Sequence, residues 1–209
     1  MKSVLISIKP KWCELIASGK KTIEVRKTRP KIDTPFKCYI YCTMGDVIKL
    51  EGHRTKATKI TFWLGKPLNN ISPGRYTGNG MVIGEFVCDE IEHFTKAFFD
   101  EQEERDTEGI AYLLEGSCLS YSELCNYVKL DDFYGWNISD LKIYDKPREL
   151  SEFTAMCKFK NDDGSCQTYK VDCPYQKYDY NQDGSINLVD CGKRLTRPPQ
   201  SYMFVEELQ

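Results

Sequence analysis

Apolar and polar positions follow the most regular pattern in the first forty residues. Residues 3–8 (SVLISI) form a short run of β-favouring residues, which predicts a buried strand. After this run, Trp12, Leu15 and Ile16 recur with the i, i+3, i+4 spacing of one helix face. Pro10 suits the first turn of that helix, and Gly19 suits its end. The pattern therefore predicts a strand followed by a short amphipathic helix.

Residues 22–26 (TIEVR) alternate between polar and apolar, as a strand with one buried face does. If Ile23 and Val25 fill the core, Thr22, Glu24 and Arg26 face a cleft or solvent. Residues 36–42 (FKCYIYC) predict the next strand. These elements predict a sheet with a polar strand face near a helix.

The rest of the chain indicates a mixed α+β protein. Ser120 and Glu123 have the spacing of a capping box, so we expect a helix from there to about residue 128. Strands are also expected at residues 59–64, 81–91 and 201–205, and a strand pair or one bent strand at 133–144. A helix is expected at residues 94–105, and loops are expected over most of residues 43–80. Residues 156–194 shift to Asp, Asn, Tyr, Gly and Cys with little periodicity. We therefore expect one main domain from residues 1–155 and 195–209, and an inserted segment at 156–194.

Composition excludes some classes of protein. The chain has 209 residues, and its longest apolar runs are far shorter than the ~18 residues that a membrane helix requires. The first residues do not resemble a signal peptide, because Lys9 and Lys11 interrupt the apolar run too early. We therefore expect a cytoplasmic protein with reduced thiols and no membrane partner.

The net charge of −2 is a sum of two opposed segments. Residues 1–59 contain fourteen Lys or Arg and five Asp or Glu, which gives +9, whereas residues 85–123 contain twelve acids and two bases, which gives −10. The basic segment could face phosphates, or the two segments could pack together and neutralise one another. An acidic face that binds another protein is a further alternative.

The sequence from Leu5 to Arg26, with its centre ELIASGKKTIEVRK, resembles the opening of ASCH domains, which are relatives of the PUA-like fold. Residues 133–153 (FYGWNISDLKIYDKPRELSEF) and 197–206 (RPPQSYMFVE) resemble the longer ASCH proteins of bacterial and phage genomes. This resemblance implies an α+β fold, namely a mostly antiparallel β-barrel with flanking helices and a cleft near the Gly-Lys-Lys-Thr turn. It also implies recognition of RNA or of a modified nucleotide.

Some similar small proteins are amidohydrolases of acetylated cytidine or ribonucleases, so a hydrolase is the alternative function. Lys21 matches the lysine that such amidohydrolases use, but Glu24 stands where they have threonine. Glu115 is the nearest match to their catalytic glutamate. The candidate catalytic residues are therefore Lys21, Glu24 and Glu115. A Lys–carboxylate pair could serve as base and acid, could bind a ligand, or could be a surface ion pair of little energetic value.

The expected ligand-binding residues surround the Gly-Lys-Lys-Thr turn and the start of the last strand. Arg26 suits a phosphate or carbonyl, and Glu24 suits a base or sugar donor. Of the tryptophans Trp12, Trp63 and Trp136, we expect Trp12 in the core and Trp136 at the pocket wall, where a base could stack. The complete set is Lys20, Lys21, Thr22, Glu24, Arg26, Trp136, Arg197, Gln200 and Ser201.

The insertion contains two patterns that could bind a metal. Residues 179–190 partly fit a calcium loop of the EF-hand type, with candidate ligands Asp179, Asn181, Asp183, Ser185 and Asp190. An Asp-Gly turn between two short strands is favoured instead, because the residues that follow cannot extend a helix. Four cysteines could hold zinc, but they lack a C-x2-C pair, and ordinary thiols are the commoner outcome: these are Cys157, Cys166, Cys173 and Cys191.

Overall fold

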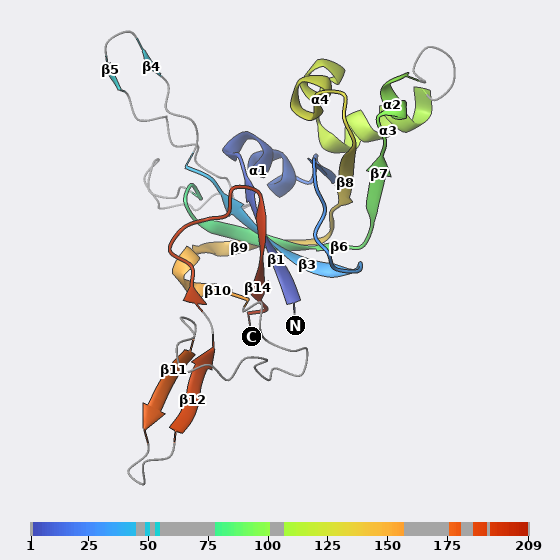
Figure 1. Cartoon of the computed structure of the whole chain (residues 1–209). Coiled ribbons are helices and arrows are strands. Elements are labelled where there is room, and N and C mark those ends of the chain that lie inside the picture. The colour runs from blue at the N-terminus through green and yellow to red at the C-terminus, as the bar shows by residue number, and fades with distance from the viewer. Residues whose placement is uncertain are drawn as a thin grey trace.

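The computed structural model of the chain describes residues 2–44, 49–50, 53–54, 78–100, 107–156, 176–180, 186–191 and 193–208. Figure 1 shows a central sheet, with the helices gathered on one side of it and a hairpin that extends from the other side. The strand expected at residues 59–64 and Trp63 lie outside the described residues.

A seven-stranded sheet forms the centre of the protein. Its strands follow the order β13-β10-β14-β1-β3-β6-β9, and every neighbouring pair is antiparallel except β1 and β3. The bounds are β1 Lys2–Ile8, β3 Phe36–Cys42, β6 Val82–Cys88, β9 Ser139–Arg148, β10 Thr154–Ala155, β13 Lys193–Arg194 and β14 Tyr202–Glu206. The first and last strands of the chain are therefore neighbours, and the N- and C-termini lie close together (Figure 1).

A three-stranded antiparallel sheet and four helices complete the main body. The sheet has the order β2-β8-β7, with β2 Ile23–Arg26, β8 Phe133–Asn137 and β7 Ile91–Phe94. The helices are α1 Pro10–Ala17, α2 Ala97–Asp100, α3 Thr107–Ser117 and α4 Tyr121–Val128, and a 3-10 turn, η2, spans Leu150–Glu152. Helices α3 and α4 lie over this small sheet (Figure 1).

Two short hairpins lie apart from these sheets. Strand β4 (Lys49–Leu50) pairs with β5 (His53–Arg54), and β11 (Gln176–Tyr180) pairs with β12 (Ile186–Cys191). Strands β10 and β13 pair with one another on either side of residues 156–192. The chain therefore leaves the seven-stranded sheet and returns to it at neighbouring strands.

The barrel expected from the family resemblance is not closed in the described part of the chain. The seven-stranded sheet ends at β13 and β9, which do not pair with one another, and β2, β8 and β7 form a separate sheet. The mixed α+β class, the mostly antiparallel pairing and the flanking helices are confirmed. The expected closed barrel is corrected: the described strands of the main body form two open sheets.

Strand β1 explains why the main body holds together. Successive side chains of a strand point to opposite faces. Val4, Ile6 and Ile8 pack on one face with α1 and β3, whereas Leu5 packs on the other face with Phe153. Both faces are covered, so β1 reads as an almost continuous apolar run in the sequence.

The sequence predicted most elements near the cleft but missed one helix and joined two strands. The single strand expected at residues 81–91 is instead β6, which ends at Cys88, followed by the start of a second strand, β7, at Ile91. Residues 107–117 form α3, for which no helix was expected. Leu113 of this helix is fully buried in one apolar cluster with Ile23 and Phe133. Packing against the small sheet therefore stabilises a helix that the periodicity of its own sequence did not predict.

The described residues contain no helix that is long and apolar enough to cross a membrane. Of the cysteines whose side chains the structure describes, six are free thiols, and four of these are buried in the core: Cys13, Cys38, Cys42 and Cys88. These four pack among apolar side chains, as the scattered spacing of the cysteines indicated.

Candidate functional site

The turn between α1 and β2 places Lys21 inside the protein. Helix α1 ends at Ala17 with Ser18 as its C-cap, and Gly19 has a φ of 73°, a left-handed conformation that glycine adopts without strain. The backbone N–H groups of Lys20 and Lys21 then both donate to Leu15 O at 3.0 Å. This tight reversal directs the Lys21 side chain under the helix, where only 3% of its surface is exposed.

The Lys21 ammonium has three acceptors. It donates to Ile23 O at 2.7 Å and to Ser117 O at 2.8 Å, and it lies 3.3 Å from Glu24 Oε2. Ser117 is the last residue of α3, so the positive charge lies at the negative end of that helix. Two carbonyl oxygens and one carboxylate oxygen therefore surround the Lys21 Nζ inside the protein.

Glu24 lies between two cations. Its Oε1 is 2.9 Å from Arg26 Nε, and this contact is an ion pair without an aligned hydrogen bond. Arg26 also donates to Ser7 O at 2.6 Å and, at 3.5 Å, to Ser201 Oγ. Lys21, Glu24 and Arg26 are all buried, and we call them the buried charge cluster. The alternation of residues 22–26 thus holds, because Ile23 and Val25 pack in the core of the small sheet.

The buried charge cluster forms the floor of a cleft with a volume of about 770 Å³. This volume is in the range of small-molecule sites. The cleft is lined by the end of β1, α1, β2 and α4, with one residue from the C-terminal segment: Ser7, Ile8, Lys9, Trp12, Lys21, Glu24, Val25, Arg26, Thr43, Leu119, Glu123, Asn126, Tyr127 and Gln200. Its charged groups are three cations and two carboxylates.

Helix α4 supplies the second wall of the cleft. Its capping box forms as expected: Ser120 Oγ accepts from the Glu123 N–H at 3.2 Å, and the Ser120 N–H donates to Glu123 Oε2 at 3.0 Å. Lys11 of α1 pairs with Glu123 Oε1 at 2.9 Å. These hydrogen bonds hold the pKa of Glu123 at about 2.

The charge segments seen in the sequence do contact one another. Lys11 pairs with Glu123, and Lys37 lies 3.8 Å from Glu85, so two ion pairs join the basic and acidic segments. Partial neutralisation by packing, which the sequence left as an alternative, therefore occurs.

The C-terminal segment completes the cleft. Ser7 N donates to Ser201 O at 2.9 Å, and Ser7 Oγ donates to Pro199 O at 2.7 Å. These bonds fasten residues 199–201 to the end of β1 and bring the Gln200 side chain to the cleft wall. Ser201 contacts Arg26 behind the wall.

The two tryptophans exchange their expected places. Trp136 is fully buried, 6.0 Å from Phe36 and 5.4 Å from Tyr202 between ring centroids, and it is not a pocket wall. Trp12 is only partly buried and lines the cleft, with its ring 5.3 Å from Lys21 Nζ. The reason is that the Trp136 side chain lies within the apolar core of the large sheet, whereas Trp12 is partly buried at the edge of that core.

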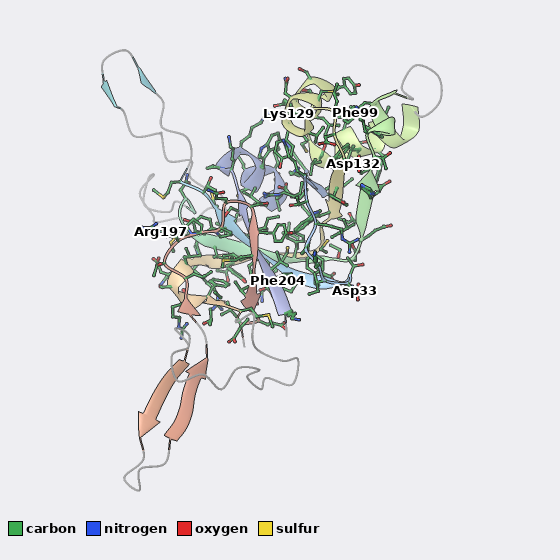
Figure 2. All side chains as sticks on the ribbon, viewed as in Figure 1. Asp33, Phe99, Lys129, Asp132, Arg197 and Phe204 are labelled. Atoms are coloured by element: carbon green, nitrogen blue, oxygen red, sulfur yellow. The ribbon has the colours of Figure 1, made fainter. Side chains whose placement is uncertain are left out.

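Four other predicted residues do not line the cleft. Glu115 is exposed on α3, so it is not placed to act with Lys21. Lys20 and Thr22 have exposed side chains next to the turn, and their backbone N–H groups donate hydrogen bonds to Leu15 O and Gly116 O. Arg197 is exposed and does not line the cleft, and it lies well away from Lys129, the residue that follows α4 (Figure 2).

Several lining residues were missed in the sequence. Lys9, Asn126 and Tyr127 lie on the cleft, but the sequence does not indicate that α4 folds back over α1. One signal was available in the sequence: Glu123 of the predicted capping box is an acidic residue that could pair with Lys11, and this ion pair joins α4 to α1.

The metal patterns lie mostly outside the described residues. Asn181, Asp183, Ser185, Cys157, Cys166 and Cys173 fall there, and Asp179, Asp190 and Cys191 are described in their strands only. Strands β11 and β12 form the hairpin that the sequence favoured over a calcium loop. Among the residues whose side chains the structure describes, no group of three or more His, Cys, Asp or Glu could hold a metal ion.

Comparison with known proteins identifies the family. Three solved structures of the ASCH protein from Zymomonas mobilis are similar at 17% identity: the unmodified protein (TM-score 0.44, 71% of this chain and 73% of that one), a serine-to-alanine mutant (0.44, 71% and 74%) and a tyrosine-to-phenylalanine mutant (0.43, 72% and 77%). No curated protein matches the sequence. The ASCH domain profile matches residues 6–123, which is more than half of the chain. The chain therefore belongs to the ASCH domain family.

Proposed function

We propose that the cleft recognises RNA or a modified nucleotide. ASCH domains have a PUA-like fold that is generally linked to RNA binding or to processing of RNA and nucleotides. One observation carries the proposal: aromatic and amide side chains line the walls of a cleft whose floor is a buried charge cluster. A nucleobase has a flat face for stacking and an edge of donors and acceptors, so it matches these two kinds of group.

The aromatic groups are Trp12 on α1 and Tyr127 on α4. Tyr127 is 41% exposed, so part of its ring is free to contact a ligand. Base stacking on an aromatic side chain contributes roughly 1–3 kcal/mol per base. Asn126 and Gln200 add amides, which pair with base edges through both a donor and an acceptor.

The same geometry supports binding over hydrolysis. The Lys21 ammonium already contacts three acceptors, and Glu24 lies between Lys21 and Arg26. A general base needs a free lone pair within reach of the substrate proton. The Lys21 Nζ is instead engaged by Ile23 O, Ser117 O and Glu24, and Glu115 does not line the cleft. We therefore assign the buried charge cluster to positioning the cleft walls and presenting charge to a ligand.

Tyr127→Ala tests the proposal, and Tyr121→Ala is the matched control. Both tyrosines are on α4 and both are 41% exposed, but only Tyr127 lines the cleft. Binding of fluorescein-labelled single-stranded RNA, and competition by ribonucleoside 5′-monophosphates with and without base acetylation, would be measured by fluorescence anisotropy. We expect Tyr127→Ala to weaken binding roughly 5- to 150-fold, as loss of one stacked base predicts.

Three outcomes decide the matter. Weakened binding by Tyr127→Ala with unchanged binding by Tyr121→Ala supports the cleft. Equal effects of the two variants, or no binding of any nucleotide or RNA by the wild type, would refute it. Turnover of an acetylated nucleoside by the wild type that Lys21→Ala abolishes, at a temperature where circular dichroism shows the variant to be folded, would instead establish the hydrolase.

A further inference from the structure

A second hollow lies beside the cleft, along the loop at residues 27–35 that joins β2 to β3. Its volume is about 560 Å³, and its lining includes Lys27, Arg29, Lys31, Asp33 and Tyr134. The loop therefore presents three cations and one carboxylate to this hollow. Figure 2 places Asp33 well away from Lys129 at the end of α4, so the acidic end of the loop is distant from the α4 wall of the cleft.

The backbone of the loop is fixed while its cations stay exposed. Pro30 is buried, and Ile32 packs against the core of the large sheet. Tyr202 Oη donates to Arg29 O at 2.7 Å, which ties the loop to β14. Lys27, Arg29 and Lys31 are all exposed. A fixed backbone with outward cations lowers the ordering cost of binding an anion.

These three cations have no acidic partner within the part of the chain that the structure describes. The ion pairs of the described residues involve Lys11, Lys21, Arg26, Lys37, His93 and Arg148. By contrast, Lys11 and Lys37 of the same basic segment are paired with carboxylates. The positive charge of the loop is therefore not neutralised by ion pairs with the described residues, unlike that of Lys11 and Lys37.

The hollow and the cleft meet at one contact. Lys27 Nζ lies 5.5 Å from the centroid of the Tyr127 ring. Lys27 lines the hollow and Tyr127 lines the cleft, so a chain that leaves the cleft past Tyr127 reaches the cations of the loop. Tyr134 lines the same hollow, and His93 stacks on its ring with centroids 4.7 Å apart.

We propose that the loop at residues 27–31 binds the backbone phosphates of a single-stranded RNA whose base occupies the cleft. The inference rests on the proposed function and extends it, because it makes a polynucleotide the ligand and not a free nucleotide. The cleft holds one base, and Arg29 and Lys31 hold phosphates on the strand that continues from it. Phosphate contacts position a strand without reading its sequence, so the loop adds affinity and salt dependence.

The experiment compares ligand length, salt and two charge-matched variants. Arg29→Gln/Lys31→Gln removes two cations from the loop, and Lys142→Gln/Lys146→Gln removes two exposed cations from β9. Random-sequence single-stranded RNA of two and eight nucleotides and the four ribonucleoside 5′-monophosphates would be titrated at 50 and 200 mM salt. Thermal unfolding of each variant verifies that it is folded.

We expect the wild type to bind the eight-nucleotide RNA more tightly than the monophosphates. Each phosphate contact to a single strand adds about 0.7 to the slope of log affinity against log salt. Two lost contacts lower the slope by about 1.4, which over a fourfold change of salt is about a sevenfold smaller loss of affinity. Arg29→Gln/Lys31→Gln should show this change, and Lys142→Gln/Lys146→Gln should not.

The outcomes separate this inference from the function on which it rests. If monophosphates bind but longer RNA binds no more tightly, or if the length effect survives in Arg29→Gln/Lys31→Gln, the loop inference is wrong and the cleft function stands. If neither ligand binds, both are wrong. An oligoglutamate peptide that displaces the RNA as well as unlabelled RNA does would show a general anion surface and would overturn the assignment to RNA.

Discussion

Replacement of Lys21 by Met removes the ammonium from the buried charge cluster but keeps a side chain of similar length. The variant leaves Ile23 O and Ser117 O without the Lys21 donor, at original distances of 2.7 and 2.8 Å, and removes from Glu24 the ion pair at 3.3 Å while its ion pair with Arg26 stays. Lys21 and Glu24 side chains are 3% and 8% exposed, so water cannot readily replace the lost contacts. Removing one member of a buried ion pair costs about 3–5 kcal/mol.

The two lost bonds from a charged donor to carbonyl oxygens lead to a similar figure. Each contributes about 1.5–3 kcal/mol, so together they give about 3–6 kcal/mol. We therefore expect Lys21→Met to lower the free energy of unfolding by about 3–5 kcal/mol. For a protein of this size the melting temperature should fall by about 6–20 °C.

Urea denaturation followed by circular dichroism measures the change, with Lys20→Met as the control. Lys20 is the preceding residue and is exposed, so its replacement should change stability by less than about 0.5 kcal/mol. A loss for Lys21→Met that is below about 1 kcal/mol would refute the reasoning, because it would mean that the buried contacts are not formed in solution.

A double variant tests whether Lys21 and Glu24 act as a pair. If they interact as the 3.3 Å separation indicates, Glu24→Gln should cost less in the Lys21→Met background than in the wild type. The difference should be about 0.5–3 kcal/mol, as expected for residues in one network. Additive effects would show that the carbonyl bonds alone hold Lys21.

Three further predictions concern separate features. Because Ser120 and Lys11 hold the pKa of Glu123 at about 2, below its usual 4.5, this carboxylate adds stability above pH 4.5 that is lost as the pH falls towards 2. The stability difference between wild type and Glu123→Gln, measured by thermal unfolding, should therefore shrink between pH 5 and pH 2.5, and a constant difference would contradict this. Burial raises the pKa of Cys88 to about 12, so iodoacetamide at pH 8 should label the half-buried Cys118 and Cys125 but not Cys88 in native protein, as peptide mass spectrometry would show. Gly84→Ala should destabilise the protein by about 1–3 kcal/mol, because a Cβ at this position lies 2.5 Å from Lys142 O of the paired strand; an unchanged urea midpoint would show that β6 and β9 can separate there.

Local patterns in the sequence predicted local structure well. The alternation at residues 22–26 identified Glu24 and Arg26 as the polar face of β2, and both line the cleft. The Ser120–Glu123 spacing identified the start of α4. These features depend on contacts a few residues apart, so their signal is contained in a short stretch of sequence.

The misplaced residues depend on contacts between distant parts of the chain. Trp136 is opposite Glu24 in the β2–β8 pairing, and its side chain joins the core of the large sheet. Periodicity does not state which strands pair, so it could not exclude Trp136 from the cleft wall. Tyr127 reaches the cleft because α4 lies across from α1, to which the Lys11–Glu123 ion pair joins it, whereas Glu115 is exposed on α3 and does not line the cleft.

The closed barrel was an expectation from the family and not from the pattern of the strands. The order β14-β1-β3 places the first and last strands together at the middle of an open sheet. No local signal indicates whether the outer strands of such a sheet meet, because that depends on sheet curvature and on the partners of β9 and β13.

The pairing of β14 with β1 has a consequence for protein synthesis. Strand β1 is made well before its antiparallel neighbour at Tyr202–Glu206 and before residue 200, which lines the cleft beside it. Until the ribosome has released those residues, β1 has a bare edge and the cleft lacks one wall. A nascent chain that lacks β14 therefore cannot assemble a complete binding site, and chaperones that shield strand edges can engage β1 during the interval between synthesis of the two strands.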